Sequence, residues 1–181
     1  GALIDFPGGG CGEIVERSQA RTTMKVTGVT SVYDLMHATG TMPLPPYIKR
    51  EPSEEDQQWY QTMFAQQEGA IAAPTAGLHF TRELVKALTA KGIELAQVTL
   101  HVGPGTFRSV KSDRIEEHRM LAEQVEVTVH TVEQIRLVQK RGNRVVAVGT
   151  TVVRALETAA RGGHGIQPFQ GPAELFITPG F

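Results

Sequence analysis

The sequence has very little of what cross-links a protein or anchors it in a membrane. Its 181 residues include a single cysteine, Cys11, so the chain cannot form an internal disulfide or a thiolate metal site, which fits a reducing compartment. No apolar run approaches the roughly 20 residues that a membrane helix needs. Residues 1–6 also lack the basic and apolar regions of a signal peptide. We therefore expect a cytoplasmic protein with no membrane contact.

Neither sign of charge dominates. Lysine and arginine total 18 against 19 aspartate and glutamate, so the formal net charge of -1 neither indicates nor excludes a nucleic-acid partner. With 40% hydrophobic residues the chain can bury a sizeable core, and its length favours one main domain with a small appendage.

The chain divides at a proline-rich linker. Residues 1–40 combine glycine clusters with short runs rich in threonine and valine, which predicts small antiparallel strands. Residues 42–47 are expected to be extended because proline excludes the helical region for the residue before it. Residues 41–181 should then form the main domain. Because the chain begins with glycine and stops directly after an expected strand, we expect an internal portion, with this domain incomplete at its C-terminal end.

The main domain alternates between helical and extended patterns. Capping residues and glycine stops predict four helices. The first two span residues 53–67 after Ser53, with Trp59, Tyr60, Met63 and Phe64 buried, and residues 81–92 after Thr81, with Leu84, Val85 and Leu88 facing inward. The other two span residues 131–141 after Thr131 and residues 150–161. Alternating or continuous apolar runs predict strands at residues 94–102, 125–129, 144–149 and 174–178. This order predicts an α/β fold, a mixed sheet with flanking helices and some parallel pairing.

Two loop segments combine polar side chains with small residues. Thr75 and His79 stand before a helix start, where free amides and a hydroxyl suit a polar ligand or an anion, although an ordinary helix-entry loop is an equal alternative. Gly103, Gly105 and Thr106 follow the strand that ends at His101, and the two glycines permit close backbone approach to a ligand. A tight turn is the alternative. The spacing matches neither the P-loop nor the dinucleotide fingerprint.

Two further segments carry charge or hydroxyls. Glu117 and His118 pair a carboxylate with an imidazole, which suits proton transfer, although a solvated charged turn is the common alternative. The other segment places Gly149, Thr150, Thr151 and Arg154 at a helix start after a buried strand, a usual ligand position in open α/β sheets, with simple capping as the alternative. No histidine or cysteine spacing indicates a metal site, and there is no nucleophile elbow.

Together these segments resemble the S-adenosylmethionine:tRNA ribosyltransferase-isomerase family of queuosine biosynthesis. The matching segments are MPLPPYI at 42–48, YQT at 60–62, AAPTAGLHF at 72–80, TLHVGPGTF at 99–107, EH at 117–118, VAVGTT at 146–151, Arg154 and FITPG at 176–180. The order and spacing of so many segments make the resemblance specific over residues 40–181. Residues 1–40 are compatible with the end of the family's β-barrel-like module.

The resemblance implies a reaction and a set of residues. The family transfers and isomerises the ribosyl group of S-adenosylmethionine onto 7-aminomethyl-7-deazaguanine in tRNA with a GUN anticodon, giving epoxyqueuosine and releasing adenine and methionine. The resemblance implies proton transfer by His101 or His79, with His118 a further candidate. The implied substrate-binding residues are Thr75, Gly103, Gly105, Thr106, Glu117, Gly149, Thr150, Thr151 and Arg154, with Arg108 and Arg119 also candidates for carboxylate or tRNA phosphate contacts. No metal is expected, and a monomer is favoured.

Some positions depart from the family pattern. Leu121 and Ala122 stand where the family usually has histidine and serine, Val152 stands where it has serine, and Glu174 lies near a usual aspartate. These departures keep open another S-adenosylmethionine-using or nucleoside-using enzyme on the same scaffold. A non-catalytic tRNA-binding domain is a second alternative.

Overall fold

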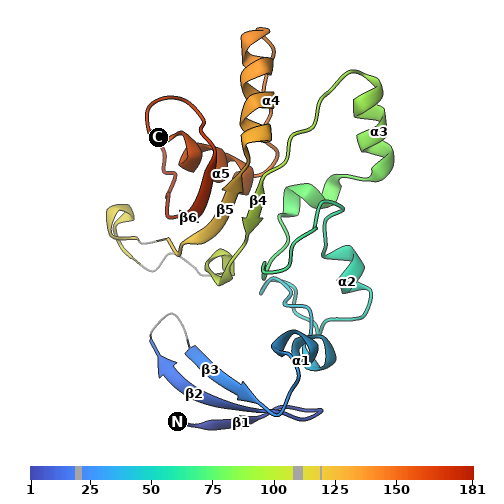
Figure 1. Ribbon diagram of the computed structural model, residues 1–181, viewed down its shortest axis with the longest axis vertical. Coiled ribbons are helices and arrows are strands. Elements are labelled where there is room, and N and C mark those ends of the chain that lie inside the picture. The colour runs from blue at the N-terminus through green and yellow to red at the C-terminus, as the bar shows by residue number, and fades with distance from the viewer. Residues whose placement is uncertain (19–21, 108–111, 119) are drawn as a thin grey trace. The chain divides into compact units, whose positions relative to one another are not determined.

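The chain divides into two units. The computed structural model describes residues 1–18, 22–107, 112–118 and 120–181. The units comprise residues 1–42 and 43–181, and the division falls at the start of the proline-rich linker (Figure 1). None of the described helices is long and apolar enough to cross a membrane.

The smaller unit is an antiparallel sheet followed by a helix. Its strands are paired in the order β1-β2-β3: β1 Leu3–Asp5, β2 Cys11–Arg17 and β3 Thr22–Thr27. The prediction of small antiparallel strands is confirmed, and the described part of this unit shows an open sheet rather than a closed barrel. Helix α1, Val32–Thr39, was not predicted. It forms because the Ser31 side chain accepts from the Tyr33 amide at 3.1 Å and because the helix buries Leu35.

The larger unit is built on a second sheet, with one helix packed on it. Strands β4 Thr99–His101, β5 Glu123–Val127 and β6 Phe169–Ala173 are paired antiparallel in that order. Helix α5, Thr150–Ala160, contacts all three strands (Figure 1). The buried core consists of Val125, Val127, Val132, Ala155, Ala159 and Ala173. The mixture of helices and strands is confirmed, but the expected parallel pairing is wrong, since every pairing between the described strands is antiparallel.

Two further helices belong to the larger unit, and the second of them contributes Val132 to this core. Helix α3, Arg82–Ala90, begins where Thr81 accepts from the Leu84 amide at 3.2 Å and is followed by Gly92 at a φ of 76°, as predicted. Leu84 is 40% exposed, however, so its predicted inward orientation is wrong. Helix α4, Val129–Lys140, is followed by the predicted stop at Gly142.

The predicted cap of helix α4 is wrong by three residues. The Thr128 side chain, not that of Thr131, accepts the capping hydrogen bond, and the donor is the Thr131 amide at 3.2 Å. Thr131 lies one turn further on and is buried, and its hydroxyl donates to the Gln97 carbonyl oxygen at 2.6 Å. The local sequence does not distinguish these two threonines as caps. The hydrogen bond from Thr131 to Gln97 holds Thr131 inside the helix and leaves Thr128 as the cap.

The helix predicted at residues 53–67 is mostly absent. Only α2, Asp56–Trp59, forms, and Trp59 and Met63 are 66% and 40% exposed rather than buried. The chain leaves the helix to pack on residues 77–80: Thr62 is buried against Gly77, and the Phe64 ring lies 5.6 Å from that of Phe80. These contacts outweigh the local helical preference.

Asp56→Asn is expected to weaken the dependence of stability on acid pH. The Arg50 guanidinium donates to both carboxylate oxygens at 2.6 Å and, with the Ser53 amide at 2.7 Å, holds the pKa of Asp56 far below its ordinary value of 3.8. Because the folded pKa is lowered, this stabilisation is complete above the unfolded pKa and is lost as the pH falls toward the folded pKa. Urea unfolding from neutral pH down through the acid range should show a smaller loss for the variant; equal losses would contradict the assignment.

The strands of the larger unit differ from their predicted ranges. Residues 144–149 are not in a strand, and Val145, Val146 and Val148 are 41%, 74% and 41% exposed. The strand predicted at residues 174–178 lies earlier, as β6, because that segment pairs with β5 from Val127 to Glu123. Strand β4 is also shorter than its predicted range, 94–102. An apolar run forms a strand only where a neighbour supplies hydrogen bonds.

Candidate functional site

Two of the predicted substrate-binding threonines line one cavity in the larger unit. Thr75 begins the 3-10 helix η1, Thr75–His79, and Thr106 lies in the 3-10 helix η2, Pro104–Phe107. The cavity measures about 420 Å³, within the range of small-molecule sites. Its lining consists of Pro45, Pro46, Tyr47, Tyr60, Ala72, Ala73, Thr75, Thr106 and Phe107. Segments far apart in the sequence therefore meet at one open pocket, in which Thr75 and Thr106 are exposed to solvent.

A neutral phenol also lines this cavity. Burial raises the pKa of Tyr60 from its ordinary 10.0, Tyr47 raises it further, and the backbone of Ala73 opposes the rise. The Tyr60 hydroxyl is therefore protonated at neutral pH and available as a hydrogen-bond donor. Tyr60 was predicted as an apolar helix residue, so sequence reasoning missed its place beside Thr75 and Thr106.

Helix η1 brings a second predicted segment to this region. A Cβ placed on Gly149 would lie 3.3 Å from the Ala76 Cβ, so the start of helix α5 touches η1. Gly149 has a φ of 98°, a conformation open to glycine and strained for other residues. Thr150 and Thr151 then form the first turn of α5, where amides are free of helical partners. The structure thus places the segments around Thr75 and Thr150 side by side.

His79 is held beside Thr75. Its side chain is exposed, and its Nδ1 lies 3.2 Å from the Thr75 carbonyl oxygen. Since a carbonyl oxygen only accepts, this contact favours the tautomer protonated at Nδ1 and leaves the Nε2 lone pair free. His79 therefore has the geometry of a proton acceptor near the cavity.

A buried ion pair fixes the turn that carries Thr106. Arg154 on α5 donates to the Glu123 carboxylate at 2.5 Å, and the other carboxylate oxygen accepts from the Gly103 amide at 2.9 Å. The two side chains are only 12% and 6% exposed. The guanidinium also donates to the carbonyl oxygens of Leu121 and Ala173 at 3.2 and 2.6 Å. The Arg154 guanidinium therefore donates its hydrogen bonds to groups of the protein itself.

The departures at Leu121 and Ala122 lie next to this network. A Cβ on Gly105 would lie 3.2 Å from the Leu121 Cβ, so the leucine packs directly on the turn that carries Thr106. Glu123 was not predicted as a site residue, yet the sequence holds a signal for it. It shares a strand face with Val125 and Val127, which are 2% and 1% exposed, so a carboxylate at that position is buried and needs a partner.

His101 lies at the end of β4, beside a loop rather than in the lining of the cavity. A Cβ on Gly69 would lie 2.7 Å from the His101 Nδ1, and the Ile71 amide donates to the Val102 carbonyl oxygen at 2.8 Å. The loop that covers His101 continues into Ala72 and Ala73, which line the cavity. His101 is thus separated from the cavity by a single loop.

His118 and Glu117 stand apart from the cavity lining. Glu117 ends the 3-10 helix η3, Ile115–Glu117, and is exposed, whereas the half-buried His118 ring lies 4.9 Å from that of Phe176. This contact gives His118 a packing role. Arg108 and Arg119 lie outside the described residues. Within the described ranges, no group of three or more histidine, cysteine or acidic side chains is placed to hold a metal ion.

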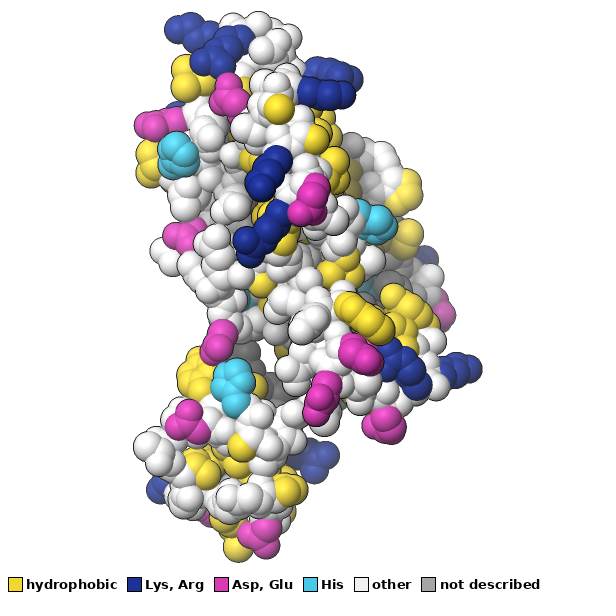
Figure 2. Space-filling view, turned by 90° about the vertical axis from the view of Figure 1, so that its right-hand side faces the viewer, with side chains coloured by type: hydrophobic (Ala, Val, Ile, Leu, Met, Phe, Trp, Pro, Cys, Tyr) yellow, Lys and Arg dark blue, Asp and Glu magenta, His cyan; other side chains and the backbone are white. Residues whose placement is uncertain are grey.

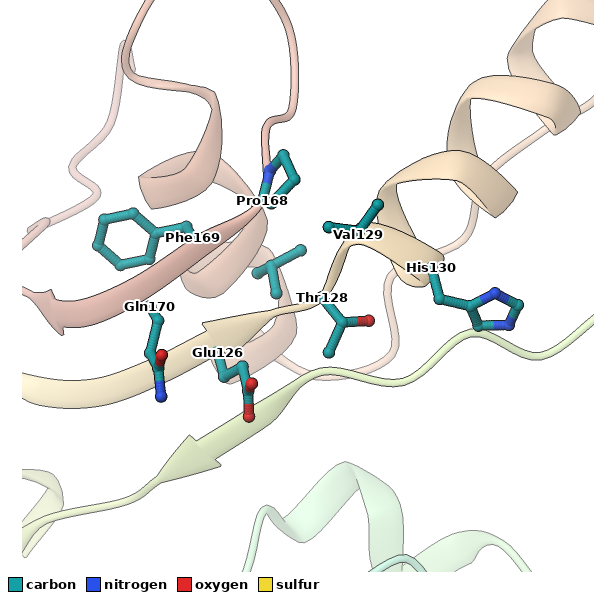
Figure 3. Close-up of a pocket in the computed structure, with 8 residues that line it drawn as sticks. Glu126, Thr128, Val129, His130, Pro168, Phe169 and Gln170 are labelled. Atoms are coloured by element: carbon teal, nitrogen blue, oxygen red, sulfur yellow. The ribbon is translucent and has the colours of Figure 1, made fainter.

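A second, larger depression of about 570 Å³ lies at the ends of β5 and β6. None of the predicted site residues lines it. Figure 3 shows that the side chains of Glu126 and Gln170 extend from the strands, whereas His130 points away from them on α4. The polar groups do not converge, so this depression is a weaker candidate than the cavity at Thr75.

Comparison with known proteins agrees with the motifs. A family model described as queuosine biosynthesis protein matches residues 1–181. A relative from Acidithiobacillus ferrooxidans, named S-adenosylmethionine:tRNA ribosyltransferase-isomerase, is 47% identical over 180 residues, which are 99% of this chain and 52% of the relative. A relative of the same name from Francisella tularensis subsp. novicida is 44% identical over 168 residues, 93% of this chain and 49% of the relative. The chain spans about half the length of these relatives, and it belongs to the queuosine biosynthesis protein family.

Proposed function

We propose that the full-length protein transfers and isomerises the ribosyl group of S-adenosylmethionine onto 7-aminomethyl-7-deazaguanine in tRNA, releasing adenine and methionine. The observation that carries the proposal is the meeting of Thr75 and Thr106 at one cavity of about 420 Å³. Membership of the family, and the names of relatives at 44% and 47% identity, support the same reaction class.

The cavity offers groups for a nucleoside. The hydroxyls of Thr75 and Thr106 can contact ribose or adenine, and the Tyr60 phenol adds a neutral donor. Gly103 and Gly105 belong to the turn that carries Thr106. Thr150 and Thr151 are outside the lining but follow Gly149, which touches η1, and they offer hydroxyls and free amides. Together these groups suit the donor substrate.

The chemistry requires proton transfer at two points. A base removes a proton beside the sulfonium, and a donor assists the departure of adenine while the amine is held for attack. We assign the proton transfer to His101, with His79 as the alternative, because both lie within one loop or one helical turn of residues that line the cavity.

A basic surface suits the tRNA backbone. Figure 2 shows lysine and arginine side chains gathered at the upper end of the view, the level at which α4 ends in Figure 1. Lys140 at the end of α4 and Arg141 and Arg144 just after it are exposed within five residues of sequence, with Arg141 paired to Glu94 at 3.0 Å. Phosphate contacts of this kind weaken as salt rises.

Product analysis tests the function. The full-length protein is incubated with S-adenosylmethionine and precursor tRNA, and the small-molecule products are separated. We expect adenine and methionine. S-adenosylhomocysteine would instead indicate methyl transfer, and salt-sensitive tRNA binding with intact S-adenosylmethionine would indicate a binding domain; either result would overturn the proposal.

The same assay tests the cavity. Thr106→Val removes one hydroxyl of the lining and should raise the KM for S-adenosylmethionine about three- to tenfold, the usual effect of one lost hydrogen bond. Gln170→Ala, in the second depression, is the matched control and should leave KM unchanged.

A further inference from the structure

The ring of His101 is covered along one edge by a glycine backbone. A Cβ built on Gly69 would lie 2.7 Å from Nδ1, 3.2 Å from Cε1 and 3.5 Å from Cγ of His101. Gly69 also has a φ of 132°, which side chains rarely adopt. Both the neighbouring ring and the backbone conformation therefore require glycine at this position.

The loop that holds Gly69 is fixed to the end of β4. The Ile71 amide donates to the carbonyl oxygen of Val102, the residue after His101, at 2.8 Å. Ala72 is 5% exposed, and with Ala73 it lines the cavity at Thr75. Residues 69–73 thus connect the covered edge of the His101 ring to the cavity lining.

We propose that Gly69 is a positioning residue for His101 and that Nε2 is the nitrogen through which His101 exchanges protons. The inference rests on the proposed function, in which His101 transfers a proton. The edge of the ring that carries Nδ1 faces Gly69, since Nδ1 is the atom nearest to the built Cβ, and this leaves Nε2 as the nitrogen further from the loop. A side chain at residue 69 would turn the ring and misplace Nε2.

A direct measurement is the imidazole NMR spectrum of the full-length protein. Gly69→Ala should shift the ring signals of His101 and lower kcat, with a changed pH profile and a KM for S-adenosylmethionine close to that of the wild type. Gly92→Ala is the matched control, because Gly92 also has a positive φ, 76°, but nothing within 4 Å of the added Cβ. Unchanged His101 signals in a folded Gly69→Ala variant would overturn the proposal.

A second pair of variants keeps the test independent of the folding of Gly69→Ala. His101→Gln places an amide nitrogen near the position of Nε2, and His101→Asn places one near Nδ1. Because an amide hydrogen-bonds but does not exchange protons near neutral pH, turnover should fall by at least about tenfold in both variants, a difference of about 1.4 kcal/mol in the barrier. Nitrogen-15 shifts of the wild-type ring that place the titrating lone pair on Nδ1 would overturn the assignment of Nε2. Wild-type turnover in both would remove His101 from proton transfer, although adenine release would still support ribosyl transfer.

Discussion

Arg154→Ala is expected to lower the free energy of unfolding by about 3–5 kcal/mol, the usual cost of breaking a buried ion pair. The variant leaves the Glu123 carboxylate, which is 6% exposed, without its cationic partner. It also removes the donor from the carbonyl oxygens of Leu121 and Ala173. Urea unfolding of the full-length protein, followed by circular dichroism, measures the change.

An exposed arginine provides the matched control, because its replacement shows how much stability is lost when an ion pair at the surface is broken. Arg141 pairs with Glu94 at 3.0 Å, but both side chains are more than half exposed, at 56% and 55%. Arg141→Ala should therefore cost less than about 1 kcal/mol. A loss of less than about 1 kcal/mol for Arg154→Ala would contradict the structural role of the buried pair.

Combining variants tests whether the pair acts as a unit. Glu123→Gln removes the negative charge while preserving the shape of the side chain. The double variant Glu123→Gln with Arg154→Ala should be more stable than the sum of the two single losses predicts, because each single change leaves its partner uncompensated. Additive losses would show that the two side chains stabilise the fold separately.

His101→Ala is expected to lower kcat for adenine release by about 10²- to 10⁴-fold, the usual contribution of a general acid or base. The KM for S-adenosylmethionine should change little, because His101 does not line the cavity. Steady-state adenine release by the full-length protein measures both constants.

Two other histidines provide the comparison. His130→Ala is the control, since His130 borders the second depression and should leave kcat unchanged. A large loss for His79→Ala with little effect of His101→Ala would contradict our assignment and favour the imidazole held by the Thr75 carbonyl oxygen.

The features predicted correctly from sequence depend on local chemistry. Thr81 caps its helix, and Gly92 and Gly142 follow helix ends with positive φ, because these positions are set by backbone groups within one turn. The fold class follows from the same local signals. The cap at Thr128 shows the limit, since a tertiary hydrogen bond placed Thr131 inside the helix.

The features that sequence reasoning missed depend on distant partners. The valines of residues 144–149 have a strand pattern but no pairing among the described strands, and they remain exposed. The short helix α2 likewise reflects the packing of Thr62 and Phe64 on residues 77–80. In the site, the motif residues Thr75 and Thr106 meet at a cavity, whereas Tyr60 and Gly69 gain their positions only from the fold.

The mass of the anticodon nucleoside after reaction tests the proposed ribosyl transfer most directly. Precursor tRNA is incubated with the full-length protein and S-adenosylmethionine and then digested to nucleosides for mass spectrometry. We expect the deazaguanine nucleoside to gain an epoxycyclopentane group. An unchanged nucleoside, from a folded protein that binds both substrates, would contradict the proposed transfer.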